Sequence, residues 1–167
     1  MRWDTRAISM HTLNSGPAIK EAQVRLNKAF VSLRKLGLLA WQSFSCCPSC
    51  ASCEIANEVE TLSEAQRNRI KGAVFYTKQQ GFENGKSGTY LSFGDIKTTK
   101  VGTVGISTKE VGKLVVTCLK EAGLSVTWNG KPTTCIWVDV APPKKKVTPA
   151  RRSKVNPLDR VSQVLGD

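Results

Sequence analysis

The sequence predicts a single α+β domain, built on a largely antiparallel sheet of about five strands with about three helices. Apolar residues recur at helical spacing in three segments, five short runs are rich in aromatic and aliphatic residues, and two Asn-Gly pairs mark tight turns. With 167 residues, 40% of them hydrophobic, the chain is long enough for one core. The predicted order is α-β-α-β-β-α-β-β, and we expect the helices on one face of the sheet.

The first half of the domain is predicted to fold as helix, strand and helix. The first helix covers residues 16–37, where Pro17 suits the first turn and Gly37 is a natural stop. Its apolar stripe consists of Leu26, Phe30 and Leu33. A strand is expected over residues 38–45, and a weaker helical pattern runs over about residues 51–62. The strand therefore leads the chain directly into a run of cysteines.

The second half is predicted to contain two hairpins and one well-marked helix. Its four strands are expected over residues 74–77, 89–93, 124–128 and 135–140. The segments 66–71 and 95–105 are predicted to be polar connections. The helix begins with Ser107 and Glu110, which form a capping box that satisfies free backbone donors, and it ends at Gly123.

Charge is distributed unevenly, and the C-terminal tail is the most basic part. The formal net charge is +12, and residues 141–167 carry seven Lys and Arg against two Asp, a net +5. The predicted parts are an N-terminal arm (1–15), the mixed domain (16–140), a basic Pro/Lys linker (141–155) and a short amphipathic terminal peptide (156–167). The terminal peptide repeats apolar residues at helical spacing and is expected to dock on a partner through Leu158, Val161 and Leu165.

Two basic clusters predict an acidic partner. In the tail, the candidate binding residues are Lys144, Lys145, Lys146, Arg151, Arg152 and Lys154. On the first helix, Arg25, Lys28 and Lys35 form a basic ridge, which is either a solvated outer face or a phosphate-binding one. The expected partner is nucleic acid or an acidic protein surface in a large assembly such as a virion. The alternative for the tail is a purely solubilising extension.

Four of the six cysteines fall within eight residues, the densest group of reactive side chains in the chain. They are Cys46, Cys47, Cys50 and Cys53. Zinc is the candidate cofactor, since a zinc site takes up to four thiolates at about 2.3 Å from the ion. The first three ligands are expected to be Cys47, Cys50 and Cys53, with Cys46, His11, Cys118 or Cys135 as the fourth. Because adjacent side chains point in different directions, Cys46 and Cys47 are not expected to share one ion.

Two other interpretations of the cluster stay open. Either the thiols pack as small apolar side chains at a turn, or Cys47 and Cys50 form a disulfide or redox dithiol at a helix N-terminus. A redox motif of that kind is typical of a βαβ unit, which the predicted element order lacks. Hydrolytic catalysis with a His base is not favoured, since His11 is the only histidine and lies in the N-terminal arm.

Five short segments occur in a fixed order along the domain. They are residues 26–30 (LNKAF), 44–50 (FSCCPSC), 72–76 (GAVFY), 90–94 (YLSFG) and 123–130 (GLSVTWNG). In this order and spacing they resemble a mainly bacterial domain family of unknown function, domain of unknown function 6891, over about residues 20–140. The resemblance supports one fold for this span and implies no activity. Its pattern includes Cys46, Cys47 and Cys50, whereas Cys53 is not a fixed part of it.

Two segments depart from the family pattern. Relatives tend to carry a His and an Asp after the Phe-Tyr pair, where this chain has Thr77, Lys78, Gln79 and Gln80. Acidic residues of the first helix are replaced by Ala22, Gln23 and Val24. If those polar positions carry the family's chemistry, this chain lacks it. The tail from Pro142 onward lies outside the resemblance.

Taken together, these features favour a non-enzymatic interaction or structural module that binds through its basic tail. The alternative is a thiol- or metal-dependent enzyme or oxidoreductase centred on the cysteine cluster. No apolar run approaches the roughly 20 residues of a membrane span, and the N-terminus lacks the apolar segment of a secretion signal. We therefore expect a protein of the cytoplasm or a virion interior, with no membrane partner.

Overall fold

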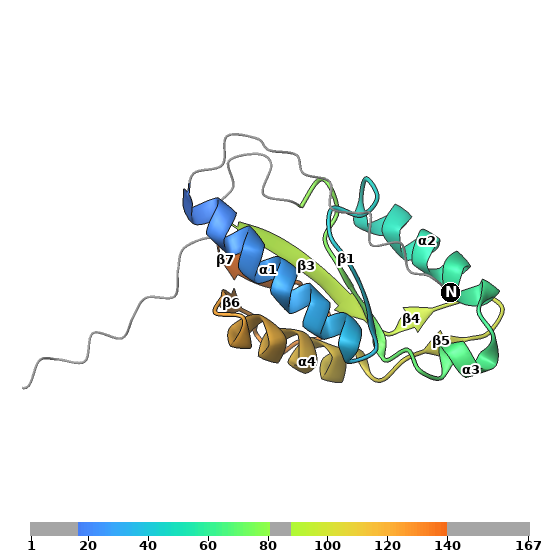
Figure 1. Ribbon diagram of the computed structural model, residues 1–167. Helices are drawn as coiled ribbons and strands as arrows, with labels where there is room; N and C mark the ends of the chain where they lie inside the picture. The colour runs from blue at the N-terminus through green and yellow to red at the C-terminus, as the bar shows by residue number, and fades with distance from the viewer. Residues whose placement is uncertain (1–16, 81–87, 140–167) are drawn as a thin grey trace, which may run out of the picture.

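The structure, a computed structural model, describes residues 17–80 and 88–139 (Figure 1). The predicted N-terminal arm, the basic linker and the terminal peptide lie outside the described residues, and so do all the candidate binding residues of the tail. The cysteine cluster and the basic ridge of the first helix lie within them.

Five strands form the main sheet, in the order β1-β2-β3-β7-β6. They are β1 (Leu38–Trp41), β2 (Gly72–Phe75), β3 (Gly88–Gly94), β6 (Ser125–Thr127) and β7 (Ile136–Asp139). Only β1 and β2 run parallel, with Leu38 opposite Gly72, and the other neighbours pair antiparallel. The prediction of a largely antiparallel five-stranded sheet is confirmed.

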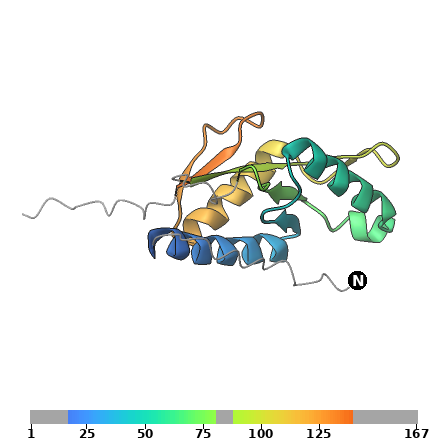
Figure 2. The same cartoon turned by 90° about the horizontal axis from the view of Figure 1, so that it is seen from above.

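Four helices accompany the sheet: α1 (Pro17–Lys35), α2 (Pro48–Thr61), the single turn α3 (Glu64–Arg67) and α4 (Thr108–Glu121). Figure 2 shows α1 and α2 on opposite sides of the strands. The expectation that all helices share one face is therefore wrong. No helix among the described residues is both long enough and apolar enough to cross a bilayer.

Strands β1 and β2 lie between two hydrophobic cores, which explains why helices pack on both faces of these strands. Leu38 and Ala40 of β1 pack with α1 and α4, whereas Leu39 and Trp41 pack with α2. Successive side chains of a strand point to opposite faces, so an uninterrupted apolar strand needs cover on both. The core under α1 and α4 is the larger and includes the fully buried Phe30.

The element boundaries differ from the prediction around the cysteines. Strand β1 ends at Trp41 rather than residue 45, because the chain bends through Ser43 and Ser45, whose φ angles are 50° and 58°. Helix α2 begins at Pro48 rather than near residue 51. Cys47 is its N-cap, with an extended backbone, and Pro48 has a fixed φ that suits the first helical position.

The segment predicted to be a polar loop at 95–105 contains a small second sheet. Strands β4 (Ile96–Lys97) and β5 (Thr103–Val104) pair antiparallel. Glu60 of α2 fixes the turn between them, since its carboxylate accepts hydrogen bonds from the Thr99 N–H (2.7 Å), the Thr99 hydroxyl (2.8 Å) and the Lys100 N–H (3.0 Å). These contacts, led by the Lys100 N–H, lower the pKa of Glu60.

Candidate metal centre

The cysteine cluster lies where the two parallel strands end. The chain leaves β1, forms the loop 42–47, enters α2 and returns as β2, which makes β1-α2-β2 a βαβ unit. The expectation that a βαβ context is missing is therefore wrong. In sheets with parallel strands, ligands bind outside the carboxyl ends of the strands, and the loop occupies that position.

Phe44 anchors this loop to the second core. Its ring stacks on Trp41 at a centroid distance of 5.0 Å and meets Phe75 edge-on at 6.5 Å. Its backbone N–H donates to the Tyr76 carbonyl at 2.9 Å. One residue later, the Ser45 carbonyl accepts from the Lys78 N–H at 3.3 Å. The residues just before the cysteines are thus held by both packing and backbone hydrogen bonds.

Ser45 sets the direction in which the chain approaches the cysteines. It has a left-handed backbone conformation, which is uncommon for a residue other than glycine. Its hydroxyl donates to the Glu54 carboxylate on α2 at 2.9 Å. The sequence did not predict this pair, because nothing in the local pattern links two residues that are nine positions apart. Such strained positions cluster at functional sites, where surrounding contacts maintain them.

Three thiols meet at the start of α2. The Sγ atoms of Cys46, Cys47 and Cys50 all lie within 4.8 Å of one another, and those of Cys46 and Cys47 are 3.8 Å apart. Sulfurs bound tetrahedrally at about 2.3 Å from zinc lie about 3.8 Å from each other. One pair therefore already has the required separation, and the others differ from it by at most about 1 Å. The expectation that Cys46 and Cys47 diverge is wrong. Three close cysteines can hold a metal ion such as zinc.

The helix N-terminus makes these thiols unequal. The backbone N–H of Cys50, the Cys50 thiol and the Cys46 thiol all hydrogen bond to Cys47, and they lower its pKa. The same thiol network acts in the opposite sense on Cys50, where the hydrogen bond to Cys47, followed by that to Cys46, raises the pKa to about 12. Thiolates are the metal-binding form of cysteine. Cys47 is therefore the first thiol of the group to become a ligand.

The other three cysteines lie apart from this group. Cys53 is exposed on α2, one turn after Cys50, and is not among the thiols brought together. Cys118 is buried on α4 in the larger core, where burial raises its pKa. Cys135 is exposed just before β7, with its sulfur 3.9 Å from the Ser92 hydroxyl. Among the described residues, no further Cys, His, Asp or Glu joins the three. The other proposed fourth ligand, His11, lies outside the described part of the chain.

The three residues of the predicted basic ridge on α1 differ in their contacts. Arg25 forms an ion pair with Glu21 and donates to the Gly123 carbonyl at 3.0 Å, so it ties α1 to the end of α4. Lys28 and Lys35 are exposed. Arg25 thus has structural partners and is half-buried, and the two lysines are the more exposed members of the ridge.

Comparison with known proteins places the chain in a family. Searches of curated proteins and of solved structures gave no significant match. A family model described as a domain of unknown function, DUF6891, matches residues 19–145. The match includes every strand of the main sheet, the three clustered thiols and most of α1. This chain therefore belongs to the DUF6891 family.

Proposed function

We propose that the domain binds one thiophilic metal ion through Cys46, Cys47 and Cys50, with zinc as the leading candidate. The observation that carries the proposal is the mutual approach of the three Sγ atoms to within 4.8 Å on a loop whose backbone is fixed by Phe44 and Ser45. Cys46 and Cys50 are exposed and Cys47 is half-buried, so an ion reaches them from solvent. Thiolate ligands favour zinc or copper(I) over magnesium or calcium.

Three thiolates leave one position of a zinc tetrahedron open. Structural zinc sites are usually closed by four protein ligands, whereas sites that act on an exogenous ligand keep one position for it. With three protein ligands, a three-thiolate site at the surface belongs to the sites that keep one position for an exogenous ligand. Water or a small anion would fill the fourth position on the solvent side of the loop.

Isothermal titration of zinc into the reduced full-length chain tests the site. We expect one ion per chain. Cys50→Ser should weaken binding by more than the roughly 10- to 100-fold that follows loss of an outer-sphere partner. Cys53→Ser is the matched control, since Cys53 stands on the same helix outside the thiol group, and it should bind like wild type.

Equal affinities of wild type and Cys50→Ser would contradict the proposal. A second contradicting result would come from mass spectrometry of protein purified with zinc and a reductant. That result is a metal-free chain with a Cys47–Cys50 disulfide. That second outcome would favour the oxidoreductase alternative, which the βαβ setting and the unequal pKa values of Cys47 and Cys50 support.

The basic tail carries a second candidate function, binding to nucleic acid or an acidic protein surface. Its support is the net charge of +5 over residues 141–167. Each duplex phosphate neutralised by a lysine or arginine contributes about −0.9 to the slope of log affinity against log salt. Deletion of residues 141–167 should reduce that slope and weaken association. A truncated chain that binds equally across a salt series would exclude this role for the tail.

A further inference from the structure

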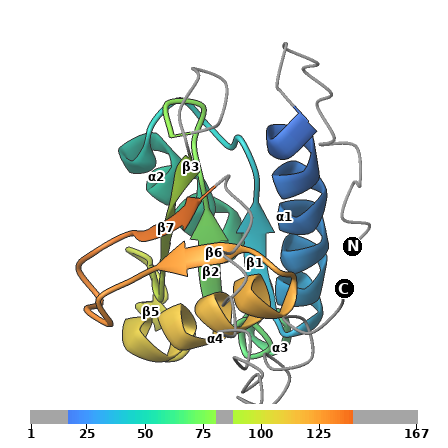
Figure 3. The same cartoon turned by 90° about the vertical axis from the view of Figure 1, so that its left-hand side faces the viewer.

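One half of the main sheet has a face that no described helix covers. Helix α2 packs over β1 and β2, and the face it shares continues across β3, β7 and β6. On those strands the buried Leu91, Ile136 and Val138 and the partly buried Val126 pack into the core on the α1 and α4 side. Their neighbours along each strand therefore point to the open side. Figure 1 shows β6 and β7 at the opposite end of the molecule from α2, and Figure 3 views the molecule from the β6 and β7 end. We call the β3-β7-β6 surface on this side the open face.

Two aromatic side chains stand together on the open face. Tyr90 of β3 is directly opposite Trp137 of β7, and their ring centroids are 4.6 Å apart at an interplanar angle of 59°. Tyr90 is 51% exposed, which is unusual for an aromatic residue in the middle of a sheet. The Trp137 ring lies against Gly88, where a Cβ atom would be only 2.5 Å from the indole. The absence of a side chain at Gly88 thus lets the indole lie against the β3 backbone.

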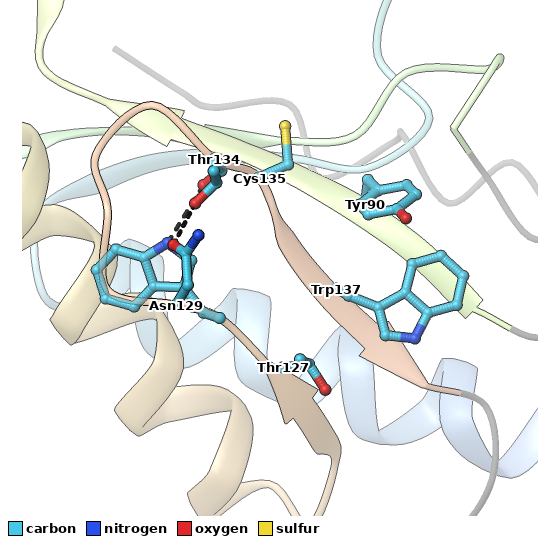
Figure 4. A pocket seen from close by; sticks show the side chains of 7 residues that line it. Tyr90, Thr127, Asn129, Thr134, Cys135 and Trp137 are labelled. Carbon is cyan, nitrogen blue, oxygen red and sulfur yellow. Dashed lines mark hydrogen bonds between the residues drawn. The ribbon is translucent and has the colours of Figure 1, made fainter.

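A shallow hollow of about 370 Å³ adjoins this pair. Figure 4 shows Thr127, Asn129 and Cys135 around it, with Tyr90 and Trp137 at one end. The side chains at its rim can form hydrogen bonds, and the loop that carries them is held by hydrogen bonds of its own. The Asn129 side-chain oxygen accepts from the Lys131 N–H at 2.9 Å and also from the Thr134 hydroxyl.

Trp128 is part of the support for this loop. Its indole N–H donates to the carbonyls of Lys131 (3.1 Å) and Thr134 (3.2 Å), and its ring meets Phe93 edge-on. Gly112 of α4 leaves the space that this ring occupies, since a Cβ atom there would be 2.6 Å from it. These contacts make Trp128 a packing residue, so Tyr90 and Trp137 are the aromatic side chains that the described part of the open face offers for stacking.

Positive charge occurs in the loop beside the hollow and in the sequence that follows β7. The loop that lines the hollow contains the exposed Lys131. Strand β7 ends at Asp139, and Lys144 follows five residues later in the sequence. A residue spans at most about 3.6 Å of chain, so covalent geometry limits the distance between Asp139 and Lys144 to about 18 Å. Covalent tethering therefore keeps Lys144 within reach of the end of β7, the strand that carries Trp137.

We propose that the open face binds single-stranded nucleic acid, with a base stacked on Tyr90 and Trp137 and a neighbouring phosphate held by Lys131. Sites for single-stranded nucleic acid combine exposed aromatic rings with positive charge. The rings stack on the flat faces of the bases, and the positive charge binds the phosphates that link the nucleotides. Duplex does not offer free base faces. A protein partner is less favoured, because it would need about 800 Å² on this side, and polar side chains surround the two rings.

This inference extends the role proposed for the tail, but it rests on different residues and is tested separately. The probe is a fluorescently labelled oligothymidylate about 12 nucleotides long, within the usual range of binding-site sizes. In anisotropy titrations of the full-length chain, Tyr90→Ala should weaken binding by about 5- to 150-fold, the range found when one stacked base loses its platform. Tyr90→Phe keeps the ring and should bind like wild type.

Val24→Ala is the matched surface control, since Val24 is 67% exposed on α1, away from the open face. It should leave the affinity unchanged, as should Cys53→Ser, because Cys53 is exposed on α2 and belongs neither to the open face nor to the thiol group. Deletion of residues 141–167 should reduce the salt dependence, while the ratio between wild type and Tyr90→Ala persists in the truncated chain. This separates failure of the tail proposal from failure of the open-face proposal.

Three results would overturn the proposal. The first is equal affinity of wild type and Tyr90→Ala with both variants folded by circular dichroism. The second is equal affinity for the oligothymidylate and a duplex of the same length, which would assign all binding to charge. The third is self-association that Tyr90→Ala abolishes, with no effect of this substitution on oligothymidylate binding, which would identify a second copy of the chain as the occupant.

Discussion

The sulfur atoms of Cys46 and Cys47 lie 3.8 Å apart, although the two residues are adjacent in the chain. Side chains that follow each other along an extended strand point to opposite sides. Here the left-handed backbone of Ser45 turns the chain just before Cys46, and Cys47 is the N-cap of α2. The two thiols consequently face Cys50, one turn into α2, and the three form one group.

Zinc should protect three cysteines from alkylation and leave others reactive. When the reduced protein is treated with iodoacetamide, added zinc should slow modification of Cys46, Cys47 and Cys50, because bound thiolates are poor nucleophiles toward the reagent. Cys53 and Cys135 are exposed and outside the group, so they should react at the same rate with or without zinc. Peptide mass spectrometry over a time course measures each site. Protection of Cys53 to the same degree as Cys50 would contradict the three-thiol assignment.

Without metal, Cys47 should react faster than Cys50 near neutral pH. Hydrogen bonds led by that from the Cys50 N–H lower the pKa of Cys47 below its ordinary value of 9.0, whereas the bond to Cys47 raises the pKa of Cys50 to about 12. Only the thiolate is nucleophilic, so a lower pKa gives a larger reactive fraction at pH 7. As pH rises, the Cys47 rate should level off first, and the Cys50 rate should keep increasing toward pH 12. The measurement is the alkylation rate of each peptide across a pH series, and a faster Cys50 at pH 7 would disprove the assigned order.

Phe44→Ala should destabilise the domain and loosen the cysteine loop. The substitution removes ring contacts with Trp41 and Phe75, and we expect the free energy of unfolding to fall by about 2 kcal/mol, below the full core value because Phe44 is only half-buried. Urea unfolding at pH 7 measures the change. Phe44→Leu keeps most of the apolar contact and should lose less. Val24→Ala, at an exposed site, should stay within about 0.5 kcal/mol of wild type.

Glu60→Gln should reduce stability at neutral pH and have little effect in acid. The carboxylate of Glu60 binds the β4–β5 turn, and these contacts, the Lys100 N–H foremost, lower its pKa in the folded state. A lowered folded-state pKa means that the stabilisation is complete above the ordinary value of 4.5 and is lost as pH falls through the folded value. The difference in unfolding free energy between wild type and Glu60→Gln should therefore shrink between about pH 5 and pH 3. A difference that is constant over this range would refute the electrostatic role.

The sequence signals that predicted the fold were local ones. The capping box of α4 is present as expected, with Ser107 accepting from the Glu110 N–H and the Glu110 carboxylate accepting from the Ser107 N–H. Hydrophobic spacing likewise located α1, whose Leu26 and Phe30 are fully buried. These features depend on residues three or four positions apart, which the sequence displays directly.

The features that escaped prediction depend on distant contacts or on single backbone angles. Glu60 holds Thr99 and Lys100 across about 40 positions, and the pairing of Tyr90 with Trp137 requires the register of two strands. Strands of two residues, such as β4, carry too little pattern to be found. The approach of Cys46 to Cys47 depends on the positive φ angle of Ser45, and a serine in the sequence does not predict such an angle.

Zinc K-edge X-ray absorption of the zinc-loaded full-length protein tests the metal site most directly, because it counts the atoms around the ion. We expect three sulfur neighbours at about 2.3 Å and one oxygen or nitrogen at about 2.0–2.2 Å. Cys50→Ser should lower the sulfur count, and Cys53→Ser should leave it at three. A shell of oxygen and nitrogen alone, or four sulfurs in wild type falling to three in Cys53→Ser, would contradict a site made by Cys46, Cys47 and Cys50.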